Sequence, residues 1–161
     1  MKLSSFNDGS KDGQLIVVSK DLTKFVYASD IALTMQAAMD NWDSIFDELN
    51  NLSKDLNGGK IEAEKFEAHN VLSPLPRAYQ WADGSAYVNH VALVRKARGA
   101  EMPDSFWSDP LMYQGGSDDF IPPLAPIYLP DESWGIDMEG EIAVITAVSY
   151  THLTLPTTPY V

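Results

Sequence analysis

Apolar residues recur at intervals of three and four between positions 31 and 56, and this spacing constrains the local fold more than any other feature. It places the residues on one face of an α-helix. Ser29 or Asp30 can cap the start of the helix, and Gly58-Gly59 supplies a left-handed stop at its end. We interpret the stripe as core and assign it no ligand. Its members are Ile31, Met35, Ala38, Met39, Trp42, Ile45, Phe46, Leu49, Leu52 and Leu56.

Three short stretches before this helix have the composition of β-strands. They run from Lys2 to Phe6, from Gln14 to Ser19 and from Lys24 to Ala28, with residues typical of turns between them. We therefore predict that residues 1–71 form an N-terminal module, a small β-meander followed by the helix. Residues 60–71 would link it to the next part of the chain.

Residues 72–147 form a second region of different character. A second helical pattern covers residues 85–98, and the basic residues in its last turn suit the helix dipole. Residues 100–134 are rich in proline and aromatic side chains. A long irregular segment of this kind is usually a functional wrap or lid.

Residues 135–146, GIDMEGEIAVIT, combine an apolar run with acidic residues at every second position from 137 to 141. In a strand, alternate residues share a face about 6.5–7 Å apart, so Asp137, Glu139 and Glu141 would project together. Like charges so close repel, and a hard divalent cation with oxygen ligands relieves the repulsion. A solvated edge strand with an acidic outer face explains the pattern equally well.

Composition excludes several classes of function. A formal net charge of −12 argues against binding to nucleic acid or to an anionic membrane surface. The chain has no cysteine, which excludes disulfides, a thiol nucleophile and thiolate zinc sites. The polar start is no signal peptide, and no apolar run approaches the length of a membrane span, so we expect a cytoplasmic protein.

The last fourteen residues, 148–161, contain no Asp, Glu, Lys or Arg. The stretch VSYTHLTLPT within them resembles the translation of a transposase-type sequencing adapter. We therefore expect an artificial tail from about residue 148, which would leave the natural protein cut off in the strand before it. A genuine C-terminal loop or strand is the alternative.

His90 lies within the second helical pattern, and Asp83 precedes it by seven residues. A packed or surface histidine and a plain helix cap at Asp83 are the simplest interpretations. If Asp83 and the two glutamates held a cation, His90 would be a nearby base able to titrate near neutral pH.

Three segments, in this order, resemble the fumarylacetoacetate hydrolase family, and its long fumarylacetoacetase-type branch most. They are PLPRAYQWADGSAYVNHVALVRKARG, WSDPLMYQGG and GIDMEGEIAVIT. The resemblance extends over nearly all of residues 1–147. It implies an α+β fold in which the β-meander and helix module is followed by the truncated start of a mixed β-sandwich or β-roll catalytic domain at 72–147.

The resemblance also implies roles for five residues. Asp83, Glu139 and Glu141 would be metal ligands for Mg²⁺, Mn²⁺ or Ca²⁺, His90 would be the catalytic histidine, and Tyr113 would contact the substrate. The implied reaction is metal-dependent hydrolysis of a carbon–carbon bond in a small-molecule 1,3-diketo acid of the fumarylacetoacetate or acylpyruvate type. A homodimer is expected for the full-length protein.

The sequence departs from this family in two ways. Fumarylacetoacetase has substrate-contacting aromatic and arginine side chains at the positions of Gly84, Ser85 and Gly99. The resemblance therefore does not identify the substrate. A further aspartate ligand, a lysine and a glutamate partner for the histidine should follow Glu141, but residues 142–161 contain no Asp, Glu or Lys. We therefore expect the chain as given to be inactive. The alternatives are a 2-oxo-4-pentenoate hydratase or oxaloacetate decarboxylase on the same scaffold, and a non-catalytic, cation-stabilised binding module.

Overall fold

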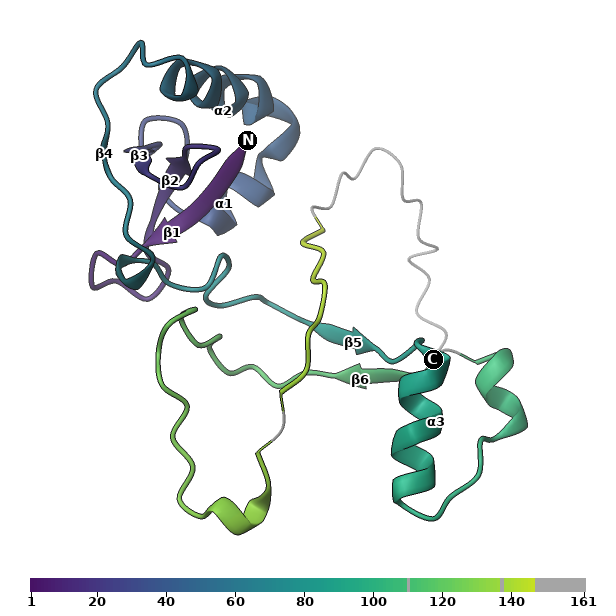
Figure 1. Ribbon diagram of the computed structural model, residues 1–161. Helices are drawn as coiled ribbons and strands as arrows, with labels where there is room; N and C mark the ends of the chain where they lie inside the picture. Colours follow the sequence, from purple (N-terminus) through teal and green to yellow (C-terminus); the bar gives the residue numbers. More distant parts are fainter. Residues whose placement is uncertain (110, 137, 147–161) are drawn as a thin grey trace, which may run out of the picture. The chain divides into compact units, whose positions relative to one another are not determined.

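The computed structural model describes residues 1–109, 111–136 and 138–146 (Figure 1). The chain divides into two compact units: Met1–Pro76 together with the chain from Phe120 onward, here called the N-terminal unit, and Arg77–Asp119, here called the hairpin unit. Antiparallel sheets combined with helices confirm the predicted α+β class. No helix in the described ranges is long and apolar enough to cross a membrane.

The N-terminal unit is built on a four-stranded antiparallel sheet whose strands follow one another in chain order. The strands are β1 (Lys2–Phe6), β2 (Gln14–Val18), β3 (Lys24–Tyr27) and β4 (Glu64–Lys65). The first three confirm the meander predicted from the sequence. The fourth lies in the segment that we had interpreted as a linker.

Two helices, α1 (Met35–Asp40) and α2 (Trp42–Asn57), replace the single helix that the apolar spacing predicted. The helical stretch begins later than predicted, because Thr34 is the N-cap and its side chain accepts a hydrogen bond from the Ala37 amide at 3.1 Å. Asn41 interrupts it with a non-helical backbone and donates its side-chain amide to the Ala37 carbonyl at 3.0 Å.

The predicted stop at the end of α2 is confirmed. Gly59 has a φ of +67°, a left-handed conformation that favours glycine. The chain reversal is fixed by the Gly58 amide, which donates to the Lys54 carbonyl at 2.9 Å, and by the Lys60 amide, which donates to the Asp55 carbonyl at 3.0 Å.

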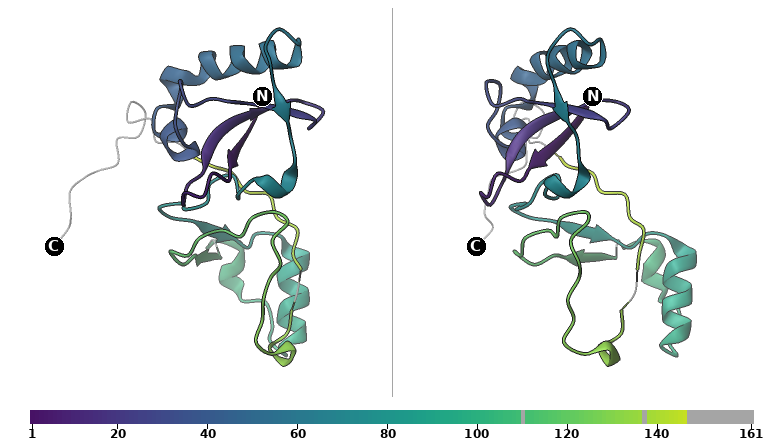
Figure 2. Two further views of the ribbon diagram at one scale, coloured as in Figure 1. Left: turned by 90° about the vertical axis from the view of Figure 1, so that its left-hand side faces the viewer. Right: turned by 60° about the vertical axis from the view of Figure 1, so that its left-hand side comes forward.

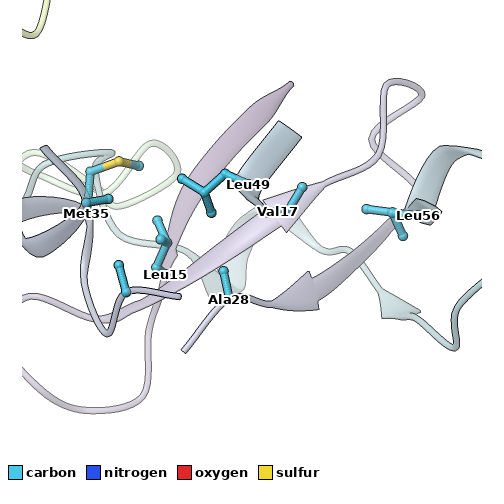
Figure 3. Packing of buried hydrophobic residues seen from close by; sticks show 8 residues of the cluster. Leu15, Val17, Ala28, Met35, Leu49 and Leu56 are labelled. Carbon is cyan, nitrogen blue, oxygen red and sulfur yellow. The ribbon is translucent and has the colours of Figure 1, made fainter. Parts of the chain in front are cut away.

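The core lies between the sheet and the helices (Figures 2 and 3). Leu15 and Val17 project from one face of β2 toward Leu49 of α2, and all three are fully buried. Ile16 and Val18 bury the opposite face in a second cluster with Phe25 and Val71. Burial on both faces explains why β2 is a continuous apolar run and not an alternating pattern.

The hairpin unit is inserted between two residues, Pro76 and Phe120, that lie close together in the N-terminal unit. The Phe120 amide donates to the Pro76 carbonyl at 2.9 Å, and the Ser73 hydroxyl donates to the Phe120 carbonyl at 3.5 Å. The chain therefore leaves and re-enters the N-terminal unit at neighbouring points.

The strand predicted for residues 135–146 is absent from the described part of this segment, which includes residues 138–146. Glu139 and Glu141 therefore do not share a strand face, and that prediction is wrong. The physical reason is that a strand needs a neighbour for its N–H and C=O groups, and residues 138–146 join neither sheet. Ile142 is 94% exposed here. Asp137 and the predicted tail at 148–161 lie outside the described residues.

Candidate functional site

The hairpin unit brings together two predicted site residues that are distant in the sequence. Strand β5 (Ala82–Gly84) pairs antiparallel with β6 (Met112–Gln114), and the register places Asp83 opposite Tyr113 (Figure 1). Residues directly opposite each other share a face, with Cβ atoms about 4.5–5.5 Å apart. The predicted metal ligand and the predicted substrate contact thus lie side by side.

Two residues beyond this pair, the same register places Trp81 opposite Gly115. The Gly115 amide donates to the Trp81 carbonyl at 3.0 Å, and the Gln114 side-chain amide donates to the same oxygen at 3.3 Å. A Cβ added at Gly115 would overlap the Trp81 ring, so the indole lies directly over this glycine. The ring also meets the Tyr113 ring edge to face, at 5.7 Å between centroids and 60° between planes.

Helix α3 (Val88–Ala97) follows β5 and carries His90 in its first turn. The N-cap is Tyr87, and Asp83 lies in β5, so the interpretation of Asp83 as the helix cap is wrong. Asp83 is half-buried, whereas His90 is exposed. An exposed ring on the first turn is accessible to a ligand and to water.

The end of α3 shows what its basic residues do. Arg95 and Lys96 lie in the last turn, as predicted, where positive charge suits the helix dipole. Arg95 also donates a guanidinium hydrogen bond to the Glu101 carbonyl at 3.2 Å, which ties the following segment to the helix. This structural role accounts for Arg95 without a substrate carboxylate.

The remaining predicted ligands, Glu139 and Glu141, lie on irregular, exposed backbone of the N-terminal unit. Across the described ranges, no group of three or more His, Asp and Glu side chains could hold a metal ion. A cation shared by Asp83, Glu139 and Glu141 stays a prediction.

The sequence interpretation missed two residues of this region, Trp81 and Gly115. Both were inside segments quoted for the family resemblance, but nothing marked them as partners. Their contact depends on the β5–β6 register, and three-residue strands leave almost no periodic pattern from which to predict a register.

Two family models match the chain in the order that the resemblance predicted. The model of the fumarylacetoacetase N-terminal domain 2 matches residues 1–77, and that of the fumarylacetoacetate hydrolase C-terminal domain matches residues 80–157. The matches identify an enzyme scaffold of the hydrolase or lyase type. The chain belongs to the fumarylacetoacetate hydrolase family. Comparison with curated proteins gives no match. The second match runs past residue 148, and the artificial tail stays a prediction.

Proposed function

We propose that a full-length protein containing this sequence is a metal-dependent hydrolase that cleaves a carbon–carbon bond in a 1,3-diketo acid. The observation that carries the proposal is the register between strands β5 and β6, which places Asp83 opposite Tyr113. A cation ligand and a substrate contact must be neighbours if the cation is to act on the substrate, and this pairing meets that requirement. Membership of the family supports the class of reaction.

The proposed cation ligands have a consistent chemistry. Asp83, Glu139 and Glu141 are all carboxylates, hard oxygen donors that suit Mg²⁺, Mn²⁺ or Ca²⁺, and the chain has no cysteine to favour a softer metal. A divalent cation bound by these residues would supply Lewis-acid stabilisation of the substrate's keto and enolate oxygens.

His90 and Tyr113 take the remaining roles. A ring nitrogen of His90 accepts a proton from water, so that hydroxide forms a bond to the carbonyl carbon. The adjacent carbon–carbon bond then breaks, and its electron pair leaves with the enolate fragment, which is protonated to complete the hydrolysis. Tyr113, beside Asp83, contacts the diketo acid and contributes to its binding.

We further propose that the 161-residue chain does not catalyse this reaction by itself. The family resemblance implies an aspartate ligand, a lysine and a glutamate partner for the histidine after Glu141, and residues 142–161 supply none of these residue types. Without the further aspartate, the proposed cation would be held by fewer carboxylate ligands and bound more weakly.

The test is the loss of ultraviolet absorbance of an enolised acylpyruvate or of fumarylacetoacetate with Mg²⁺ or Mn²⁺. A full-length family member carrying residues 1–146 of this chain should be active, and His90→Ala or Glu141→Ala should lower its rate by about 100-fold or more. His69→Ala is the control, since His69 lies on a short 3-10 helix of the N-terminal unit, 3.4 Å from Glu67.

Three outcomes would contradict these proposals. A His90→Ala variant with the wild-type rate would remove the assignment of the base. Turnover of oxaloacetate or a 2-oxo-4-pentenoate, without turnover of any diketo acid, would reassign the reaction on the same scaffold. An ordinary enzymatic rate from the 161-residue chain would overturn its proposed inactivity.

A further inference from the structure

We infer that Trp81 is a positioning residue for Tyr113, and that Gly115 is a glycine because the Trp81 ring occupies the space of its side chain. The inference rests on the proposed function in one respect, the role of Tyr113 as a substrate contact. The geometry itself concerns only residues of the hairpin unit.

Backbone hydrogen bonds set the position from which the Trp81 ring projects. The Trp81 carbonyl accepts from the Gly115 amide and from the Gln114 side chain, so Trp81 is tied to β6 although it precedes β5. Trp81 and Asp83 are two residues apart in extended chain, and such residues project from the same face. The indole therefore lies on the face that carries Asp83 and Tyr113.

The indole limits how the Tyr113 ring can move. Tyr113 is 59% exposed, and a side chain this open to solvent keeps much of its rotamer freedom. The edge-to-face contact with Trp81 favours one ring position, because such contacts depend on geometry. The indole also lies against Gly115, and a glycine is required at that position because even a methyl group there would displace the indole.

A purely structural role for Trp81 makes a different prediction. An aromatic ring over a cross-strand glycine also stabilises the strand pair. In that case its loss would lower the stability of the hairpin and leave substrate affinity intact. If Trp81 positions Tyr113, its loss raises KM and changes kcat little, because binding contacts made equally in the ground and transition states are lost.

The first experiment uses the 161-residue chain and needs no activity. Proton NMR should show nuclear Overhauser contacts between the Trp81 indole and the Tyr113 ring, and Gly115→Ala should abolish them. Gly116→Ala is the matched control, because a Cβ there would meet only Asp118, with the carboxylate oxygen at 3.3 Å as the nearest atom. Absence of these contacts in the wild-type chain would overturn the inference.

The second experiment measures kinetics in the full-length family member carrying residues 1–146. Trp81→Ala and Gly115→Ala should each raise KM by about tenfold or more, Trp81→Phe should recover most of the loss, and Gly116→Ala should match the wild type. Because Gly115→Ala leaves Trp81 itself unchanged, it tests the idea even if Trp81→Ala fails to fold. An unchanged KM in Gly115→Ala would overturn the positioning role.

Failure of the inference and failure of the proposed function give different results. A wild-type enzyme that turns over no diketo acid contradicts the function, and the NMR contacts still decide whether Trp81 holds Tyr113. A wild-type enzyme that is active, with variants at Trp81 and Gly115 that keep its KM, contradicts the inference alone.

Discussion

The N-terminal unit and the hairpin unit differ in how they are held together. The N-terminal unit buries both faces of β2, and Leu15 and Leu49 lie fully buried in its core. Among the described residues of the hairpin unit, Val91 is the only one that is buried, while Leu93 and Tyr113 are each 59% exposed. Stability is therefore concentrated in the N-terminal unit, and the residues proposed for chemistry lie where apolar packing is sparse.

This difference agrees with a general feature of proteins, in which stability and function are carried by different parts of the structure. Binding and catalytic residues are often carried by less stable segments that a rigid scaffold positions. Here the backbone bonds of the β5–β6 pair and the Trp81–Tyr113 contact supply the local order that a core supplies elsewhere. Three predictions test this difference between the two units.

Truncating a leucine in each unit should reveal the greatest difference in stability between them. Leu49→Ala leaves a cavity in the N-terminal core and should lower the free energy of unfolding by about 2–5 kcal/mol. Leu93→Ala in α3 of the hairpin unit, where the side chain is already mostly in water, should cost less than about 1 kcal/mol. Urea denaturation followed by circular dichroism measures both. Equal losses would show that the hairpin unit contributes as much packing as the N-terminal unit.

A smaller effect is expected from adding a methyl group to glycines with positive φ. Gly13, with a φ of +65°, lies where a Cβ would come within 2.5 Å of the Phe6 carbonyl oxygen. Gly99 of the hairpin unit has a nearly identical φ of +67°, but a Cβ there would have no neighbour within 4 Å. Both substitutions carry the left-handed penalty of about 1 kcal/mol, and Gly13→Ala adds the clash with backbone.

The same urea denaturation compares the two variants. Gly13→Ala should lower the free energy of unfolding by about 2–3 kcal/mol, clearly more than Gly99→Ala. If the two variants lose the same stability, the dense packing around the first turn of the N-terminal unit is not what distinguishes the two positions.

The two units also differ in how well the sequence predicts them. Turn residues and continuous apolar runs were enough to place β1, β2 and β3 and the end of α2, because those local signals agree with the burial that the fold imposes. The sequence did not predict the division into α1 and α2 at Asn41. The spacing of apolar residues carries no information on a polar side chain that hydrogen-bonds to the preceding turn. The strand predicted at 135–146 failed for the opposite reason, since a local pattern cannot supply the neighbouring strand that it needs.

The candidate site was predictable only as a set of residue types. The family resemblance, carried by the quoted motifs, predicted Asp83, His90 and Tyr113 as site residues. Asp83 and Tyr113 are cross-strand neighbours only because of the register between β5 and β6, two strands of three residues. Tertiary structure sets this register, and the local sequence does not. The roles of Trp81 and Gly115 follow from the same register, and for that reason they emerged from the structure alone.

The turn between β2 and β3 should make stability depend on pH, more weakly than either substitution pair affects it. Asp21 accepts hydrogen bonds from the Ser19 hydroxyl at 2.6 Å, the Thr23 hydroxyl at 2.8 Å and the Thr23 amide at 3.1 Å. These bonds, that from Ser19 most of all, lower the pKa of Asp21 from its ordinary value of 3.8. Because the folded protein holds the carboxylate in its charged form, this stabilisation is fully present above the ordinary pKa. It is lost as the pH falls through the lowered pKa of the folded state.

Asp21→Asn isolates this contribution from those of the other acidic residues. The variant should be slightly less stable than the wild type at about pH 7, and the difference should shrink toward zero as the pH falls through the lowered pKa of the folded state, below which the wild-type carboxyl is protonated as well. Urea midpoints of both proteins measured across this range give the difference directly. Because the turn belongs to the unit that carries the core, global unfolding should report the titration. A difference that stays constant with pH would mean that the charge of Asp21 does not stabilise the turn, and that its hydrogen bonds are retained by the amide.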